Sequence, residues 1–235
     1  MTTETKTNGN DIIGAMFEVG AHFGYQKSRR DASITPYVYG TKNKIDIIDL
    51  EKTKEQLESA KDFVKKLAKE GKQILFVGGK NEAKGFVKAG ADAINMPNVA
   101  GRWIGGTLTN ASEIKKRIAK FEDLSKQKEK GELSKYTKKE RLLIDRQIEK
   151  LNEMFSGIVN MKDMPKAVFI IDPRKEAIAL AEAKKMNIPV VSLLNTDCNI
   201  DLIDYPVVAN DSATSSVSFF INEIVDAYKE GKSAK

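Results

Sequence analysis

Cysteine, histidine and tryptophan each occur only once in this chain of 235 residues, as Cys198, His22 and Trp103. A single thiol cannot form an internal disulfide, which fits a reducing compartment. One cysteine and one histidine also cannot supply the four ligands of a zinc finger or a zinc ribbon. The sequence therefore excludes disulfide scaffolds and cysteine-rich zinc modules.

Long apolar runs are missing as well. A membrane-spanning helix needs roughly 18 consecutive apolar residues, and no run in this chain approaches that length. The polar start MTTETKTNGN lacks the cationic and apolar regions of a signal peptide. With 41% apolar and 7% aromatic residues, the composition is that of a globular protein able to bury a core. We therefore expect a soluble, unexported protein with no membrane partner.

Catalytic motifs are scarce too. The chain has no HExxH, GxSxG or GxxxxGK[ST] pattern, and FVGGKNEA offers only Gly78 and Gly79 before Lys80. Glycines at a strand end can direct backbone N–H groups at a phosphate, but the tight turns of a doubly wound sheet need them anyway. A nucleotide-binding or metal-dependent enzyme stays the alternative function. We expect no catalytic residue, no metal and no cofactor.

Short apolar runs alternate with amphipathic helical segments in two parts of the chain. The runs are QILFVGG, AINMP, AVFIID, IPVVSLL and YPVVA, with helices expected near residues 82–89, 174–187 and 212–228. Continuous apolar strands joined by helices are typical of a sheet covered on both faces. The pattern predicts an α/β domain with a doubly wound parallel sheet.

The first 71 residues add two helices and a strand pair. One helix is expected from Asp11 to Gly20, and another from a cap at Asp49 to Gly71. Between them, YVYG and IDIIDL are typical of two short strands joined through TKNK, with an asparagine in the turn.

Residues 111–155 interrupt the alternation with two charged helical segments joined by GELSKY. Each segment has one narrow apolar seam, which predicts an antiparallel helical hairpin, or coiled coil, that projects from the sheet domain and buries its own seam. The hairpin is either solvated and packed only on itself, or its basic sides grip phosphate or another protein. The seam residues are Ile114, Ile118, Phe121 and Leu124, followed by Ile144, Ile148, Leu151 and Phe155.

These patterns divide the chain into four parts. We expect a disordered N-terminal tail over residues 1–10 and a C-terminal tail over 231–235. The α/β sheet domain is discontinuous and consists of residues 11–110 and 156–230. Residues 111–155 form the inserted hairpin.

Positive charge is concentrated in two zones. The net charge is +6, and residues 111–150 alone hold thirteen Lys and Arg against eight Asp and Glu. Residues 27–44 hold five cations and only one acid, Asp31. Such zones on an otherwise balanced chain favour an anionic partner.

His22 lies in GAHFGYQKSRR, where cations follow it closely. Carboxylates at the sheet ends could meet it in the fold and form a metal site with it. One of them could instead form a buried His–Asp pair, and a catalytic histidine needs such an orienting carboxylate. Its neighbouring cations favour a surface-binding loop whose histidine holds the loop in shape. The carboxylates in question are Asp172, Asp197, Asp204 and Asp211.

Trp103 lies in the glycine-rich segment VAGRWIGGTLTN, next to Arg102. The tryptophan either packs at the base of the hairpin or lies with the arginine on a sugar–phosphate surface, where charge neutralises phosphate and the planar ring stacks.

Several segments resemble, in the same order, the signature segments of the bacterial-type small-subunit ribosomal protein S-two family. They are EVGAHFGYQ, ITPYVYGTKNKIDIIDLEKT, ILFVGGK, GRWIGGTLTN, AVFIID and LLNTDCNIDLIDYPVVANDSA, and the match extends from about residue 11 to residue 230. The chain departs from many members at Tyr25, where they have histidine, and at Asn195, where they have aspartate. Both departures weaken an inherited metal site.

The resemblance implies a flavodoxin-like sheet domain with an inserted coiled coil and a non-enzymatic, structural role in translation. It implies a place at the junction of head and body of the small ribosomal subunit. The implied partners are small-subunit ribosomal RNA and other ribosomal proteins, including the messenger-binding protein S-one, and no small-molecule substrate. We expect a cytoplasmic ribosome, with an organellar ribosome as the second option.

We expect the cations to neutralise RNA phosphates, so that binding depends steeply on salt and little on base identity. Trp103 either touches RNA or supports its loop. The predicted RNA-binding residues are Lys27, Arg29, Arg30, Lys42, Lys44, Arg102 and Trp103, together with Lys115, Lys116 and Arg117 at the hairpin base.

Overall fold

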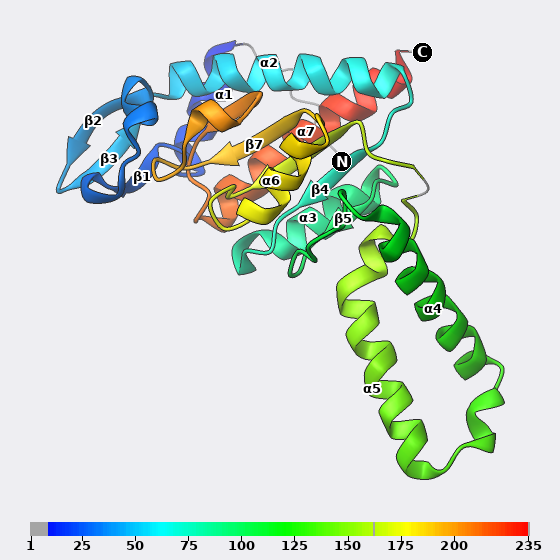
Figure 1. The fold of residues 1–235 in the computed structure, drawn as a ribbon. Coiled ribbons are helices and arrows are strands. Elements are labelled where there is room, and N and C mark those ends of the chain that lie inside the picture. The colour runs from blue at the N-terminus through cyan, green and yellow to red at the C-terminus, as the bar shows by residue number, and fades with distance from the viewer. Residues whose placement is uncertain (1–8, 162, 235) are drawn as a thin grey trace, which may run out of the picture.

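The computed structural model describes residues 9–161 and 163–234 (Figure 1). Its centre is a five-stranded parallel sheet in the order β5-β4-β6-β7-β8. Numbered by appearance in the chain, this order is 2-1-3-4-5, which is that of a flavodoxin-like doubly wound sheet. The predicted fold class is therefore confirmed. The strands are Ile74–Val77 (β4), Asn98–Val99 (β5), Ala167–Ile171 (β6), Val190–Leu194 (β7) and Tyr205–Val208 (β8).

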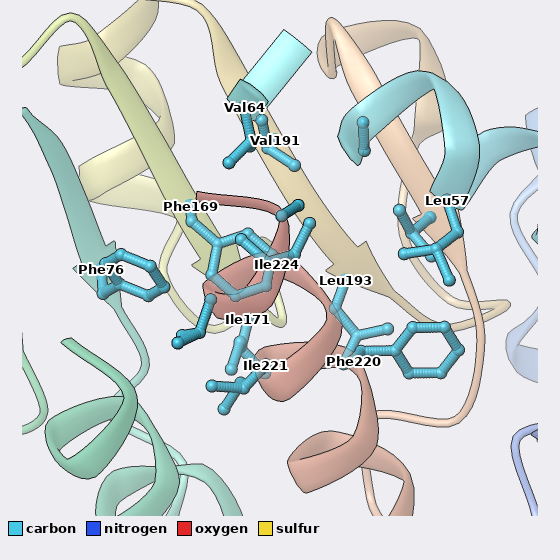
Figure 2. Close-up of a cluster of buried hydrophobic side chains, with 14 of the residues drawn as sticks. Leu57, Val64, Phe76, Phe169, Ile171, Val191, Leu193, Phe220, Ile221 and Ile224 are labelled. Atoms are coloured by element: carbon cyan, nitrogen blue, oxygen red, sulfur yellow. The ribbon is translucent and has the colours of Figure 1, made fainter. Parts of the chain in front are cut away.

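Every residue of β4, β6 and β7 is buried, because both faces of the sheet are covered. Successive side chains of a strand point to opposite faces, so each strand contributes to two cores. On one face, Phe76 and Phe169 pack against helices α2 (Leu50–Lys69) and α7 (Thr214–Ser233), as Figure 2 shows. Helix α3 (Asn81–Ala93) packs beside α7 on this face.

The second core lies on the other face of the sheet. Leu75 and Val168, each one residue before a side chain of the first core, pack there against helix α6 (Ala177–Lys185) and Trp103. This core also contains Ile114 and Phe155, the two residues at the base of the helical hairpin.

A second, antiparallel sheet with the order β1-β3-β2 precedes the main sheet. The predicted strand pair is confirmed, and its turn is formed by Asn43 and Lys44 with φ of 52° and 66°. Positive φ at both turn residues is the geometry of a type I′ hairpin. The elements of this region are α1 (Gly9–Glu18), β1 (Phe23–Gln26), η1 (Lys27–Arg29), η2 (Ala32–Tyr37), β2 (Val38–Lys42) and β3 (Ile45–Ile48).

The inserted segment forms helices α4 (Ala111–Glu129) and α5 (Lys138–Phe155), connected through η3 (Glu132–Lys135). In Figure 1 the pair extends away from the sheet domain. Thr137 and Glu140 start α5 with a reciprocal capping box, and Lys128 pairs with Asp145 across the two helices at 2.7 Å. Coiled-coil packing of the two helices stays a prediction.

The base of this hairpin differs from what the sequence indicates. Ile118 and Leu151 along the seam are only half-buried, whereas Ile114 and Phe155 are 4% and 1% exposed and belong to the second core. The hairpin therefore does not bury its whole seam by itself, because its last turns complete the core of the sheet domain.

The chain ends also differ from the expected tails. Helix α1 begins at Gly9, so the last two residues of the expected tail 1–10 are helical, and residues 1–8 lie outside the described part. Helix α7 continues to Ser233, into the expected tail 231–235. A Cβ on Gly231 would lie 2.6 Å from the carbonyl oxygen of Lys65, so glycine lets α7 lie directly against α2 and extend the contact.

Candidate RNA interface

The guanidinium of Arg30 binds two side chains of the small sheet, Asp46 and Thr41. Its Nε and one Nη donate hydrogen bonds of 2.7 Å to the two carboxylate oxygens of Asp46, and the same Nη donates to Oγ1 of Thr41. Asp46 is fully buried, so its charge needs a hydrogen-bonded partner. Arg30 is therefore the structural partner of Asp46, and its contact with RNA stays a prediction.

Four other cations of this region are exposed, and none forms an ion pair with another residue of the described ranges. The backbone N–H of Lys27 donates to the carbonyl of Lys44 at 2.9 Å, which brings the two ends of the basic segment together. The guanidinium of Arg29 lies 5.5 Å from the ring centre of Tyr25. We call η1 and the β2–β3 hairpin the arm, and its exposed cations Lys27, Arg29, Lys42 and Lys44 the arm cations.

One carboxylate organises the loop that leads into α4. Glu182 of α6 is 8% exposed and accepts a hydrogen bond from Nε1 of Trp103 at 3.2 Å. Backbone N–H groups of Gly106, Leu108 and Thr109 donate to it at 2.7 to 3.2 Å. Burial alone would raise the pKa of this carboxyl, but the hydrogen bonds outweigh burial and lower the pKa.

Trp103 and Arg102 have different surroundings. The tryptophan is 6% exposed and belongs to the second core, so its indole supports the loop and the reading in which it stacks on RNA is corrected. Arg102 is exposed and forms no ion pair among the described residues.

The three cations at the hairpin base are exposed on the first two turns of α4. Consecutive helical residues point about 100° apart, so Lys115, Lys116 and Arg117 cannot all face one surface. Nζ of Lys116 lies 3.4 Å from Glu113, with both side chains largely exposed. The structure therefore does not bring these three together as one patch.

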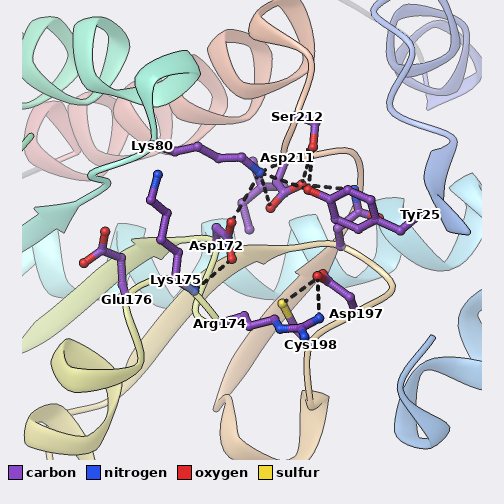
Figure 3. Close-up of polar contacts among 12 residues, drawn as sticks. Tyr25, Lys80, Asp172, Arg174, Lys175, Glu176, Asp197, Cys198, Asp211 and Ser212 are labelled. Atoms are coloured by element: carbon purple, nitrogen blue, oxygen red, sulfur yellow. Dashed lines mark hydrogen bonds and ion pairs between the residues drawn. The ribbon is translucent and has the colours of Figure 1, made fainter. Parts of the chain in front are cut away.

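Lys80 lies beyond the carboxyl end of β4 and reaches Asp172, beyond the end of β6, at the sheet edge where flavodoxin-like domains bind ligands (Figure 3). Its Nζ lies 3.0 Å from Asp211 and 3.3 Å from Asp172, and it donates to the hydroxyl of Tyr25 at 3.2 Å. Burial alone would lower the pKa of Lys80, but the two carboxylates raise it, whereas burial raises the pKa of Asp211. Lys80 is thus held as an internal counter-ion.

The backbone of the glycine turn is also occupied by the protein itself. The N–H of Gly79 donates to Oε1 of Glu176 at 3.1 Å. This amide would be needed for phosphate binding in the nucleotide-binding reading. The arrangement matches a closed structural turn.

The imidazole of His22 contacts two aromatic rings. Its ring centre lies 4.4 Å from that of Phe17 and 4.0 Å from that of Phe23. Burial lowers the pKa of the imidazole, and the carbonyl of His22 accepts a hydrogen bond from Ile48 at 2.8 Å. These contacts agree with a histidine that holds its loop in shape.

The four sheet-end aspartates contact cations instead of His22. No group of three or more His, Cys, Asp and Glu residues suited to hold a metal is found in residues 9–161 and 163–234. Within the same ranges, no helix is both long and apolar enough to cross a membrane. The contacts are Asp172 and Asp211 with Lys80, Asp197 with Arg174, and Asp204 with Lys184.

Sequence reasoning missed Glu182, Asp46 and the role of Lys80. Glu182 left one signal, because it lies among the small buried residues Ala179 and Ala183 on the inner face of a short helix. A carboxylate in that position needs several hydrogen-bond donors nearby. Asp46 left a similar signal in the strand pattern IDII.

A flavodoxin-like domain whose Lys80 is held by its own carboxylates at the sheet ends, and whose arm carries exposed cations that are unpaired among the described residues, fits a structural docking protein better than an enzyme. Residues 16–231 match the family model described as "Ribosomal protein S2". Over 220 residues the chain is 42% identical to the "Small ribosomal subunit protein uS2" of Coprothermobacter proteolyticus, a match that covers 94% of this chain and 82% of that relative.

The chain belongs to the ribosomal protein S2 family, and the resemblance seen in the sequence is confirmed. It is a structural ribosomal protein of the small subunit that serves translation, and it is not an enzyme. The alternative of a nucleotide-binding or metal-dependent enzyme was wrong.

Proposed function

We propose that the chain binds small-subunit ribosomal RNA at the junction of head and body of a cytoplasmic ribosome. The observation that carries this proposal is the arm, where Lys27, Arg29, Lys42 and Lys44 are exposed without an ion-pair partner among the described residues. Most of the ion pairs of the structure use lysines elsewhere, on α2, α4, α6 and α7. The arm therefore keeps its positive charge available for a partner.

Two features hold the backbone of the arm in place. The buried pair of Arg30 and Asp46 joins η1 to β3, and the type I′ turn fixes the positions of Lys42 and Lys44. Cations that are already positioned lose less conformational entropy when they meet phosphates. Each phosphate contact should lower the logarithm of the binding constant by about 0.7 to 0.9 per decade of salt.

Arg102 and the hairpin base supply a second contact in this proposal. Arg102 is exposed beside the loop fixed by Glu182, and Lys115, Lys116 and Arg117 follow on α4. Since these three point in different directions, we expect only some of them to touch RNA.

The protein partner is proposed to be the messenger-binding protein S-one, with other small-subunit proteins as neighbours. An apolar surface suited to a protein lies beside the arm, where Phe17, Phe23 and Tyr39 are 61%, 48% and 82% exposed. Phe17→Asp with Tyr39→Asp should abolish capture of purified S-one by small subunits that carry the variant. Unchanged capture would remove S-one from this surface.

The RNA proposal is tested by reconstitution of small subunits that lack the protein. The variant K27Q/R29Q/K42Q/K44Q should be displaced by parent protein in competition and should wash off at lower salt. The control K66Q/K69Q/K166Q/K232Q removes the same charge from four exposed lysines outside the arm and should incorporate like the parent. Equal incorporation of both variants would contradict the proposal.

A further inference from the structure

We propose that a basic cleft between α3, the loop at residues 100–105 and the end of α5 is a second binding site for the ribosomal RNA backbone. The inference rests on the proposed RNA binding, includes the Arg102 contact proposed above, and adds Lys84, Lys88 and Lys150, which that proposal does not use. The cleft has a volume of about 1000 Å³. Its charged lining residues are Lys84, Lys88, Arg102 and Lys150, with the acids Asp92 and Glu153.

The cleft has a net positive charge, and its cations are unpaired among the described residues. All four cations are exposed, and none of them forms an ion pair with a residue of the described ranges. Lys84 and Lys88 are four residues apart on α3, so their Cα atoms are separated by about 6 Å along the helix on one side. Four cations against two acids leave the cleft with a net positive charge.

A neighbouring hollow of about 300 Å³ shares Lys84 and Arg102 with the cleft. Its lining adds the cation Lys175 and the acid Glu176. The basic surface therefore continues from α5 across the loop to the carboxyl end of β4, over a longer distance than a single phosphate needs.

The floor of the cleft is preformed. Gly157, in the short 3-10 helix η4 (Ser156–Ile158) that follows α5, packs so closely on the backbone of Asn98 in β5 that a Cβ would collide with it. On the loop side, Glu182 fixes the backbone of Gly106 at 2.7 Å. A rigid floor keeps the cations of three separate elements together without the cost of ordering them on binding.

The geometry fits a row of phosphates better than a nucleotide or a base. The cations come from α3, the loop and α5, whereas one phosphate is bound by convergent donors such as the amides at a helix start. The only tryptophan of the cleft is buried against the second core and offers no open face for stacking. The contacts are therefore to the sugar–phosphate backbone, and base identity should matter little.

The first test measures salt dependence with the full chain and deproteinised small-subunit ribosomal RNA. The K84Q/K88Q variant should lower the slope of log binding constant against log salt by about 1.4 to 1.8, since each lost phosphate contact removes about 0.7 to 0.9. The control K66Q/K69Q changes two exposed lysines of α2 and should keep the parent slope. A parent slope in K84Q/K88Q would overturn the inference.

Both variants should unfold within about 2 °C of the parent, because the altered side chains are exposed. The two proposals fail in different ways. Parent protein whose RNA binding is insensitive to salt would contradict the proposed function itself. Salt-dependent binding by the parent, with an unchanged slope in K84Q/K88Q, would contradict the cleft alone.

The second test identifies the occupant. The full chain with Lys88→Cys is labelled at the new cysteine with a photoactivatable thiol reagent. The labelled protein is then assembled into small subunits. The natural thiol of Cys198 is 3% exposed and burial raises its pKa, so the reagent should attach at position 88. A crosslink to ribosomal RNA supports the inference, and a crosslink to a ribosomal protein alone, or none, overturns it.

Discussion

Glu182 accepts a hydrogen bond from the indole N–H of Trp103 at 3.2 Å, although 79 residues separate them in the chain. The same carboxylate holds the backbone of Gly106 and Leu108. A single side chain of α6 therefore sets the course of the loop that carries Arg102 and enters the hairpin. The position of the proposed cleft depends on this contact.

Glu182→Gln should destabilise the protein by about 2 to 3 kcal/mol. The amide is the same size, but its NH₂ group would face backbone N–H donors, which are then left buried without an acceptor. Urea unfolding followed by circular dichroism measures the loss. The exposed Glu58, paired with Lys54 at 3.9 Å, provides the control, since Glu58→Gln should change stability by less than about 0.5 kcal/mol. Equal stability of the two variants would contradict the assigned role.

Arg29 and Arg30 should separate binding from stability. Arg30→Ala leaves the buried Asp46 without its partner and should lower the free energy of unfolding by about 3 to 5 kcal/mol. Arg29→Ala removes an exposed cation and should change stability by less than about 0.5 kcal/mol while weakening incorporation into small subunits. Chemical unfolding and competitive reconstitution distinguish the two. A fully stable Arg30→Ala protein would show that Asp46 does not need this partner.

The effect of shortening the hairpin on stability should depend on whether its base is kept. Residues 119–150 replaced by a six-residue Gly/Ser linker, about 13 Å in root-mean-square length, can join helices packed 8 to about 10 Å apart. This variant should keep cooperative unfolding. Removal of residues 111–155 also deletes Ile114 and Phe155 from the second core and should cost more than about 3 kcal/mol. Equal stability of both deletions would show that the hairpin base adds nothing to that core.

Lys80→Met should make stability depend more strongly on pH. Burial already raises the pKa of Asp211, and loss of Lys80 should raise it further. A carboxyl whose pKa is higher in the folded state favours folding below its unfolded pKa, and this contribution is lost as pH rises through the folded value. The variant should therefore lose about 3 to 5 kcal/mol at neutral pH and less near about pH 4.

The matched double variant tests the cause of that loss. K80M/D211N removes the fully buried carboxylate and leaves Asp172, which is partly exposed, so it should recover part of the stability that K80M loses at neutral pH. Urea titrations at both pH values provide the measurement. If K80M is equally destabilised at acid and neutral pH, its effect comes from packing and the ion pair is not the reason.

Local patterns predicted the central strands and the turn at Asn43 because each depends on nearby residues. The edge strand was placed differently, since AINMP ends before β5 begins at Asn98. A strand of two residues is defined by its hydrogen bonds to β4, and its own composition carries little signal. The helix expected over 174–187 begins later, at Ala177, after a turn in which Asp172 has a φ of 59°.

The sequence by itself determined the fold class, the inserted helices and the zones of positive charge, because apolar periodicity and charge are properties of neighbouring residues. Only the tertiary structure decided which cations are free. Arg29 and Arg30 are adjacent and chemically identical, yet one is exposed and the other is held by Asp46 of β3. The cleft likewise needs Lys84, Arg102 and Lys150 from three elements. Ion pairing depends on distances across the folded chain, and sequence separation does not encode them.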